Sequence, residues 1–179
     1  MKAKIWMLCF VLCLCSCKNL FKDEEFSIKC VSYTGSELRI DGYYYIKSTF
    51  GDKKYINCFI FYFNGVSSPV QTEADNLNDV ESSIASRSEN KYLKNNLYAW
   101  GPFSIYENTL RMQYYEPSDY LSKRVLELTC TILNDSTFYL EKIHLVSTGQ
   151  EITERFFNIG EYRFKQFSHK PDSTNNFLP

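Results

Sequence analysis

Cysteine and histidine are the residues of this sequence that could carry chemistry, and their spacing decides which chemistry is open to them. The chain has 179 residues, with seven Cys and two His. A metal site needs clustered His, Cys or carboxylates, and a catalytic triad needs a nucleophile, a His and an acid. His144 falls within a predicted strand and His169 in a polar tail. We therefore expect no catalytic residues and no metal site, with an unusual enzyme as the most distant alternative.

Composition and motif searches exclude other classes of function. Twenty basic and twenty-one acidic residues leave a net charge of −1, without the basic excess that nucleic-acid-binding proteins carry. The hydrophobic fraction of 44% is too high for a disordered chain. The sequence contains no phosphate-binding loop, dinucleotide fingerprint, zinc-protease motif or nucleophile elbow. We expect no nucleic-acid partner and no nucleotide cofactor.

The N-terminal segment has the pattern of a secretory signal. Lys2 and Lys4 precede an uncharged apolar run over residues 5–15, and polar residues follow from Lys18. A membrane-spanning helix needs about 20 apolar residues, whereas a run of about 7–15 is typical of a signal peptide. The pattern predicts a signal peptide over residues 1–16, with a buried helix as the alternative.

The end of this segment, Leu14-Cys15-Ser16-Cys17, resembles the lipobox of bacterial lipoproteins. The resemblance implies cleavage before Cys17 and attachment of lipid to the Cys17 sulfur, followed by acylation of the new N-terminus. Several acyl chains hold a protein stably on a membrane, whereas one chain binds only marginally. The lipobox resemblance therefore implies a membrane partner and an envelope location, which we expect to be the outer membrane. It implies no cofactor other than covalent lipid on Cys17.

A polar stretch follows Cys17, and we expect residues 17–36 to form a tether between the lipid and the folded domain. Its acidic cluster, Asp23-Glu24-Glu25, resembles signals that direct some Bacteroidota-type lipoproteins to the cell surface. Ordinary solvation of a tether explains the cluster equally well. The periplasmic and surface faces of the membrane therefore both stay open.

Three cysteines follow the signal segment, namely Cys30, Cys58 and Cys130. An oxidising compartment would allow one disulfide and leave one thiol over. The absence of a C-x-x-C pair and the wide separations do not resemble a zinc ribbon. Because Cys58 and Cys130 lie in apolar strand patterns, we favour small buried hydrophobic residues over a disulfide.

Short apolar runs joined by tight turns dominate the rest of the chain and predict antiparallel strands. One run, residues 55–63, is apolar almost throughout, so it must be covered on both faces or shielded outside. Pro69 predicts a sheet edge. Only residues 73–96 have helical spacing. We expect one or two short amphipathic helices there, which would pack over the apolar sheet. The strands are expected at 38–47, 55–63, 66–71, 98–106, 109–115, 124–133, 137–147, 151–157 and 162–167.

Eight or nine consecutive antiparallel strands favour an up-and-down barrel, because closing a sheet removes its edges. We predict a mainly β, lipocalin-like barrel of about eight strands over residues 37–167, with one short helical insertion and a C-terminal tail over 168–179. An open meander or a sandwich is the alternative.

Five segments resemble a set of uncharacterised Bacteroidota-type envelope lipoproteins with a lipocalin-like barrel. The resemblance implies a fold and an envelope location but supplies no catalytic residues. It departs from true lipocalins, which carry their Trp on the first strand, whereas Trp100 lies in mid-chain. The segments are Leu38–Tyr44, Asn64–Val66, Trp100–Ile105, Ile132–Phe138 and Lys170–Asn175.

Aromatic residues support the leading functional hypothesis. The chain has fourteen Tyr, fourteen Phe and two Trp, and an eight-stranded barrel can hold side chains or one small ligand. We expect non-enzymatic binding of a small apolar or sugar-like ligand, in or at the mouth of the barrel. The alternative is a filled barrel that acts through its outer face in an envelope protein complex. The candidate inward-facing binding residues are Tyr44, Tyr62, Trp100, Phe103, Met112 and Tyr114.

Two short motifs resemble the Asp-Ser/Thr-X acceptor of envelope O-glycosylation. They are Asp135-Ser136-Thr137 on a predicted turn and Asp172-Ser173-Thr174 in the tail. The resemblance implies Ser136 and Ser173 as candidate acceptors. The sequence Asp-Ser-Thr also favours a turn when it carries no sugar.

Overall fold

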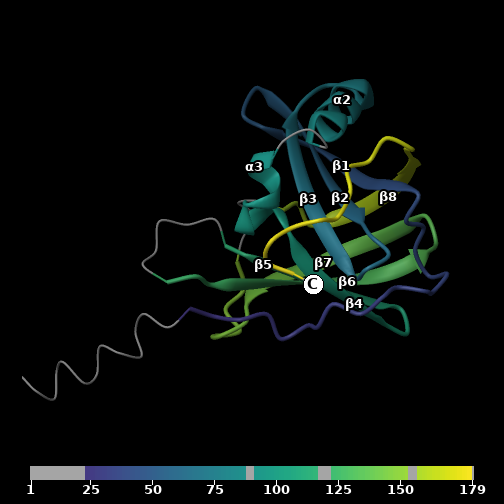
Figure 1. Ribbon diagram of the computed structural model, residues 1–179. Coiled ribbons are helices and arrows are strands. Elements are labelled where there is room, and N and C mark those ends of the chain that lie inside the picture. Colours follow the sequence, from purple (N-terminus) through teal and green to yellow (C-terminus); the bar gives the residue numbers. More distant parts are fainter. Residues whose placement is uncertain (1–22, 88–90, 117–121, 153–156, 179) are drawn as a thin grey trace, which may run out of the picture.

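Eight antiparallel strands form a closed barrel in which each strand pairs with its neighbours in the sequence (Figure 1). The computed structural model describes residues 23–87, 91–116, 122–152 and 157–178. It confirms the predicted up-and-down topology and excludes the open meander and the sandwich. The strands are β1 Gly42–Phe50, β2 Lys53–Phe61, β3 Val66–Glu73, β4 Gly101–Tyr106, β5 Thr109–Tyr115, β6 Val125–Asn134, β7 Thr137–Leu145 and β8 Gly160–Gln166.

Closure of the barrel depends on pairing of β1 with β8, from Gly42↔Gln166 to Tyr45↔Arg163. The two backbones approach closely at Gly42, where an added Cβ would lie 2.0 Å from the Lys165 carbonyl oxygen. Glycine at this position therefore permits the first and last strands to meet.

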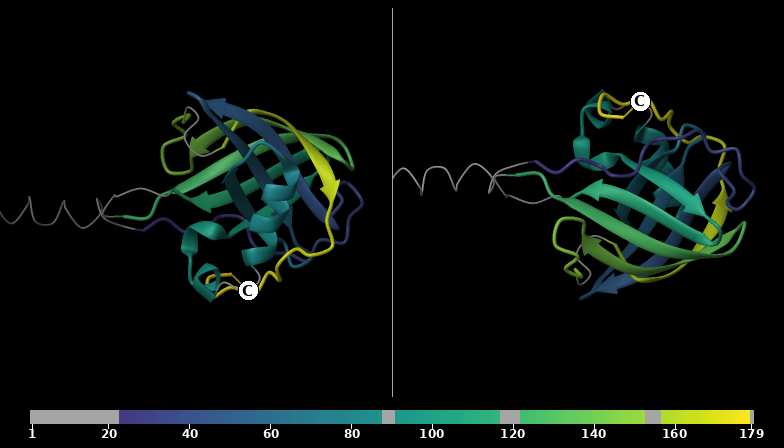
Figure 2. Two further views of the ribbon diagram at one scale, coloured as in Figure 1. Left: turned by 90° about the horizontal axis from the view of Figure 1, so that it is seen from above. Right: turned by 90° about the horizontal axis from the view of Figure 1, so that it is seen from below.

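The helical segment lies between β3 and β4, as predicted. It contains α2 Leu77–Arg87, the single turn α3 Lys91–Lys94 and the 3-10 turn η2 Leu97–Ala99. The Asn76 side chain accepts hydrogen bonds from the Asn78 and Asp79 backbone N–H groups at the start of α2, which is the usual chemistry of a helix N-cap. Figure 2 shows that α2 lies outside the barrel, across the strands.

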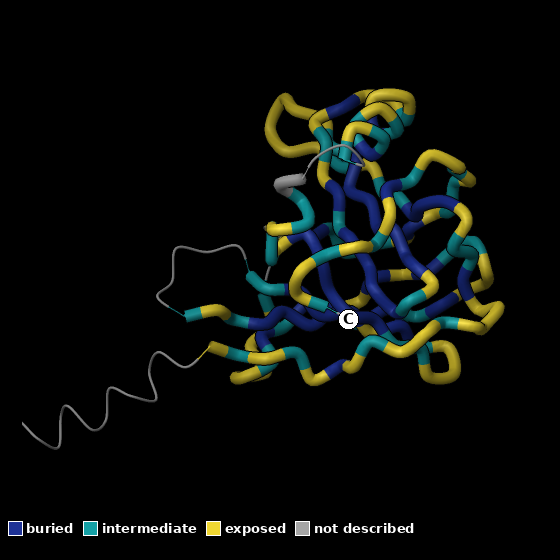
Figure 3. The backbone as a smooth tube through the Cα atoms, in the orientation of Figure 1, coloured by how far each residue is buried: buried dark blue, intermediate teal, exposed yellow. Residues whose placement is uncertain are grey.

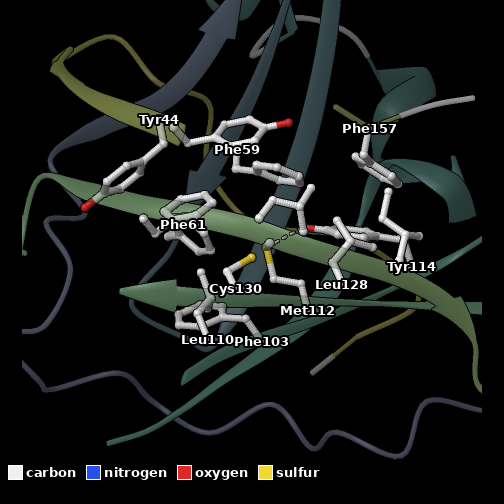
Figure 4. Packing of buried hydrophobic residues seen from close by; sticks show 14 of the residues in the cluster. Tyr44, Phe59, Phe61, Phe103, Leu110, Met112, Tyr114, Leu128, Cys130 and Phe157 are labelled. Carbon is white, nitrogen blue, oxygen red and sulfur yellow. Dashed lines mark hydrogen bonds between the residues drawn. The ribbon is translucent and has the colours of Figure 1, made fainter. Parts of the chain in front are cut away.

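Aromatic side chains fill the described part of the barrel interior. The Phe59 ring lies 5.1 Å from Tyr162 and 6.2 Å from Phe138, centroid to centroid. The Tyr44 ring contacts Phe61 and Phe138 at 5.6 and 5.1 Å. These contacts cross from strand to strand, so the interior is a packed aromatic core along most of its length (Figure 4).

A second apolar cluster lies between the outer face of the barrel and the helical segment. Ile56, Cys58 and Ile60 of β2 point outward into it, together with Val80 and Ile84 of α2. The inward neighbours of these β2 residues, Phe59 and Phe61, belong to the interior. The prediction that the run over 55–63 is covered on both faces is therefore confirmed for residues 56–62, whereas Phe63 is 59% exposed. Figure 3 colours the backbone by the burial of each residue.

Residues 23–41, which we call the N-terminal strap, lie against the barrel. Ser27 and Ile28 donate backbone hydrogen bonds to the Gln113 Oε1 atom of β5 at 2.8 and 3.1 Å, and Leu38 packs into the interior cluster. The described part of the expected tether therefore does not stand off the domain. The first strand begins at Gly42, four residues later than predicted, because residues 38–41 complete the strap.

The C-terminal tail also packs against the domain. The Lys170 ammonium donates hydrogen bonds to the Ile40 carbonyl and, at 2.9 Å, to the Phe61 carbonyl. It lies 4.8 Å from the centroid of the Tyr62 ring. The Lys170 contacts with the Ile40 carbonyl, the Phe61 carbonyl and the Tyr62 ring hold the tail over the second cluster. Burial lowers the pKa of the Lys170 ammonium.

The described residues of the predicted strand over 151–157 are not part of a strand of the barrel. Glu151 forms one isolated bridge with His144, and residues 153–156 lie outside the described part of the chain. Phe157 packs into the interior cluster. In the described part of this stretch, the connection between β7 and β8 supplies Phe157 to the core and contains no ninth strand.

Truncation of Phe59 tests the packed interior. We expect Phe59→Ala to lower the free energy of unfolding by about 3–5 kcal/mol, because it removes a ring buried among five others. Phe50→Ala, at a position that is 82% exposed, should change it by no more than about 0.5 kcal/mol. Urea denaturation measures both, and equal losses would contradict a filled core.

Candidate functional site

A cleft opens where β3 parts from β4. The two strands pair only at Val66↔Pro102 and Ser67↔Gly101, although β3 continues to Glu73. Pro69 lies on the diverging part, and proline cannot donate a backbone hydrogen bond to a neighbouring strand. The sheet edge that the sequence predicts at Pro69 is therefore present within the closed barrel, because β2 is the one described strand that pairs with this part of β3.

The cleft has a volume of about 140 Å³. Ligand pockets for drug-sized molecules measure about 300–1,000 Å³, so this space accepts one ring or a short chain. Tyr98 of η2 lies at its exposed side, 41% exposed. The residues that line it include Asn57, Phe59, Gln71, Tyr98, Tyr114 and Phe157.

Three stacked rings, which are labelled in Figure 4, form the inner wall of the cleft. The ring planes of Phe59 and Phe157 are 16° apart with centroids at 5.5 Å. Tyr114 stacks on Phe157 at 5.5 Å and on Phe59 at 6.1 Å. Such a wall offers an apolar face to a planar or ring-shaped ligand.

A hydrogen bond fixes the Tyr114 ring in this wall. The Tyr114 hydroxyl and Ser67 Oγ are 2.6 Å apart, and Ser67 Oγ also donates to the Gly101 carbonyl at 3.1 Å. Burial raises the Tyr114 pKa, so the phenol stays protonated at neutral pH. An added Cβ on Gly101 would lie 1.9 Å from the Gln113 carbonyl oxygen, so this close approach requires glycine.

Asn57 supplies a polar group inside this apolar cleft. Its side chain is buried, with 3% exposed, and its Nδ2 donates to Ser48 Oγ at 3.1 Å. Its Oδ1 has no hydrogen-bond partner among the described residues. A buried acceptor without a donor costs free energy. The Oδ1 atom is closed off from solvent, so a ligand hydroxyl or amide N–H would satisfy it once the Asn57 side chain turns toward the cleft.

The structure places the six predicted binding residues in two different environments. Tyr44, Phe103, Met112 and Tyr114 face the interior, as predicted, but only Tyr114 of these lines the cleft. The inward orientation predicted for Tyr62 and Trp100 is wrong. Both lie in the second cluster, with ring centroids 5.9 Å apart.

Strand alternation explains the error at Tyr62. Phe61 faces inward, so the next side chain faces outward, and a strand that is apolar on both faces hides this from the sequence. The Trp100 Nε1 atom donates to the Leu93 carbonyl at 2.8 Å, which turns the indole toward the helical segment. Asn57 was missed, although a polar residue within an apolar run is a signal in the sequence.

The other candidate residues have simpler surroundings. Cys30, Cys58 and Cys130 are free, and Cys58 and Cys130 are buried in different clusters, which confirms that they are small core residues. Burial raises the Cys58 pKa to about 12. Cys17 lies outside the described residues.

Both proposed glycosylation motifs make local turn contacts. Ser136 Oγ donates to Asp135 Oδ1 at 2.7 Å. In the tail, the Thr174 backbone N–H donates to Asp172 Oδ1 at 2.8 Å. Ser136 and Ser173 are partly exposed, and their modification stays a prediction.

Over the described ranges, no group of three or more His, Cys, Asp and Glu side chains could hold a metal ion. None of the helices in those ranges is long and apolar enough to cross a bilayer. His144 Nε2 lies 3.9 Å from Glu127 Oε1, and His169 lies beside Ser168 and Phe167.

Comparison of the chain with protein-family profiles, curated proteins and solved structures finds no match.

Removal of the Ser67 hydroxyl tests the wall of the cleft. We expect Ser67→Ala to lower the free energy of unfolding by about 1–3 kcal/mol, because it leaves the buried Tyr114 hydroxyl without its short hydrogen bond. A double-mutant cycle with Tyr114→Phe, measured by urea denaturation, should show coupling. Additive losses would contradict the interaction.

Proposed function

We propose that this chain is a lipid-anchored lipoprotein of the bacterial cell envelope that binds a small ligand in the cleft, without catalysis. The lipobox-like Leu14–Cys17 segment supports the anchor and, with the barrel, a place among Bacteroidota-type lipoproteins, on the outer membrane. The buried, unpartnered Asn57 Oδ1 atom beside three stacked rings is the observation that carries the binding proposal.

The proposed ligand presents a ring with an apolar face and at least one hydrogen-bond donor. The apolar face packs on Phe59, Tyr114 and Phe157, while the donor reaches Asn57 Oδ1. A sugar ring has both features, since its C–H groups form an apolar face and its hydroxyls donate. A purely apolar ligand would leave the Asn57 acceptor unsatisfied, so these contacts favour the sugar-like alternative.

The filled interior supports a second candidate, an interaction lipoprotein that contacts an envelope protein through its outer face. Tyr106 and Phe63 are 76% and 59% exposed, and exposed aromatic residues are common at protein interfaces. A ligand in the cleft distinguishes the first proposal from this one.

The anchor is tested with Cys17→Ala. This change removes the sulfur that would carry the lipid, so we expect loss of labelling by a radioactive fatty acid and release of the chain from membranes. Cys30→Ala serves as the matched control and should keep both properties. Persistent labelling of Cys17→Ala would contradict the anchor.

Ligand binding is tested with Asn57→Leu. Native mass spectrometry of envelope-extracted protein should find a bound species in the wild type that is lost in this variant, because leucine cannot accept a hydrogen bond. Asn57→Leu removes the unsatisfied Oδ1 acceptor but also the hydrogen bond from Nδ2 to Ser48 Oγ, so urea denaturation must show that the variant is folded before loss of the bound species is assigned to the acceptor.

Asn64→Leu is the control for the binding experiment, because Asn64 also has a buried, unpartnered Oδ1 atom but lies outside the cleft in the turn after β2. It should retain the bound species. A wild type without any bound species, or equal loss in both variants, would contradict binding at the cleft.

A further inference from the structure

The N-terminal strap has a direction along the barrel. Its first contacts are at the start of β6, where the Glu24 backbone N–H donates to the Lys123 carbonyl at 2.9 Å and Val125 donates to Glu24 Oε2 at 2.7 Å. Near its other end, at the turn after β6, the Arg39 N–H donates to the Asp135 carbonyl at 3.0 Å. The strap therefore runs from one end of the barrel to the other.

The strap begins at the end of the barrel that carries the cleft. Asp23 accepts a hydrogen bond from the Lys123 backbone N–H at 2.9 Å and pairs with the Lys123 ammonium at 3.2 Å. The Phe26 ring lies 4.4 Å from the ring of Tyr115, which lines the cleft. Figure 1 shows the first described residues beside the end of β5.

The length of chain before Asp23 limits how far this end can lie from a lipid on Cys17. Six residue steps separate the two residues, and six extended residues span at most about 22 Å. The polar region of each leaflet is about 5–8 Å thick and takes up part of this length. The tight-turn end at Tyr106 is farther away, because the seven residues of β5 rise by about 20 Å.

We propose that the end of the barrel with the cleft faces the membrane, and that the cleft binds the sugar headgroup of a lipid in that membrane. This inference rests on the proposed lipid anchor at Cys17 and on the proposed binding in the cleft. The short connection places the open side of the cleft near the layer in which lipid headgroups lie. A single ring fits the volume of about 140 Å³, while the acyl chains of the lipid stay in the bilayer.

Orientation is tested with tryptophan reporters in the full lipidated chain. Tyr98→Trp reports on the cleft and Tyr106→Trp on the tight-turn end, and both start from an exposed tyrosine. In phosphatidylcholine vesicles with a dansyl-labelled headgroup lipid, energy transfer falls steeply with distance. We expect more energy transfer to the dansyl group from Tyr98→Trp than from Tyr106→Trp, after the transfer from the native Trp100 has been subtracted from each value.

A longer connection serves as the control for orientation. Thirty Gly and Ser residues inserted after Lys22 have a root-mean-square length of about 30 Å, so the difference between the two reporters should disappear. Equal transfer from both reporters in the uninserted, vesicle-bound chain would overturn the orientation while leaving the anchor intact. Failure of the wild-type chain to float with vesicles would instead show that the anchor itself is wrong.

The ligand class is tested with vesicles that contain a monoglycosyl diacylglycerol. We expect this lipid to change the Tyr98→Trp emission, the change to disappear when Asn57→Leu is added, and methyl glucoside in solution to give a much smaller change. An equal response to methyl glucoside would overturn the membrane source. No response to the glycolipid would overturn the sugar-headgroup proposal.

Discussion

The burial of β2 on both faces is the constraint on which the rest of this structure depends. Its inward rings, Phe59 and Phe61, belong to the interior, while Ile56, Cys58 and Ile60 face outward. Apolar surface is stable only when it is removed from water, so a second layer must cover the outer face of β2. The helical segment and the C-terminal tail form that layer.

This second layer also explains the cleft. The helical segment is inserted between β3 and β4, so the chain must leave the end of β3, cross the outer face and return to the start of β4. The strands β3 and β4 then pair at only two positions. Asn57 and Gln71 line the cleft that this separation leaves. The cleft is thus a consequence of how the barrel covers its most apolar strand.

The two ends of the barrel differ, because the strap begins and the cleft lies at the same end. Packed rings occupy the middle, and the cleft lies where this packing ends. Gln113 links the strap to the outer face through Ser27 and Ile28, and its Nε2 donates to Glu127 Oε2 at 2.7 Å. Burial tends to raise the Glu127 pKa, but hydrogen bonds from Arg111 and Gln113 outweigh it and keep the pKa low. The carboxylate therefore stays charged at neutral pH and continues to accept these hydrogen bonds.

The sequence by itself indicated eight of the strands and the helical segment, because these depend on local alternation and turn residues, and it favoured a closed barrel because closure removes sheet edges. Leu110, Met112 and Tyr114 face inward as their spacing predicts, and residues 73–96 contain the helices. Only the tertiary structure decided the orientation of Tyr62, because β2 is apolar on both faces and period-two alternation then carries no signal. The same is true of Trp100, whose Nε1 atom donates to the Leu93 carbonyl of the helical segment. It also decided that Asn57 lies beside Tyr114 and Phe157, since residues so far apart in sequence meet only through barrel closure and the long connection before β8.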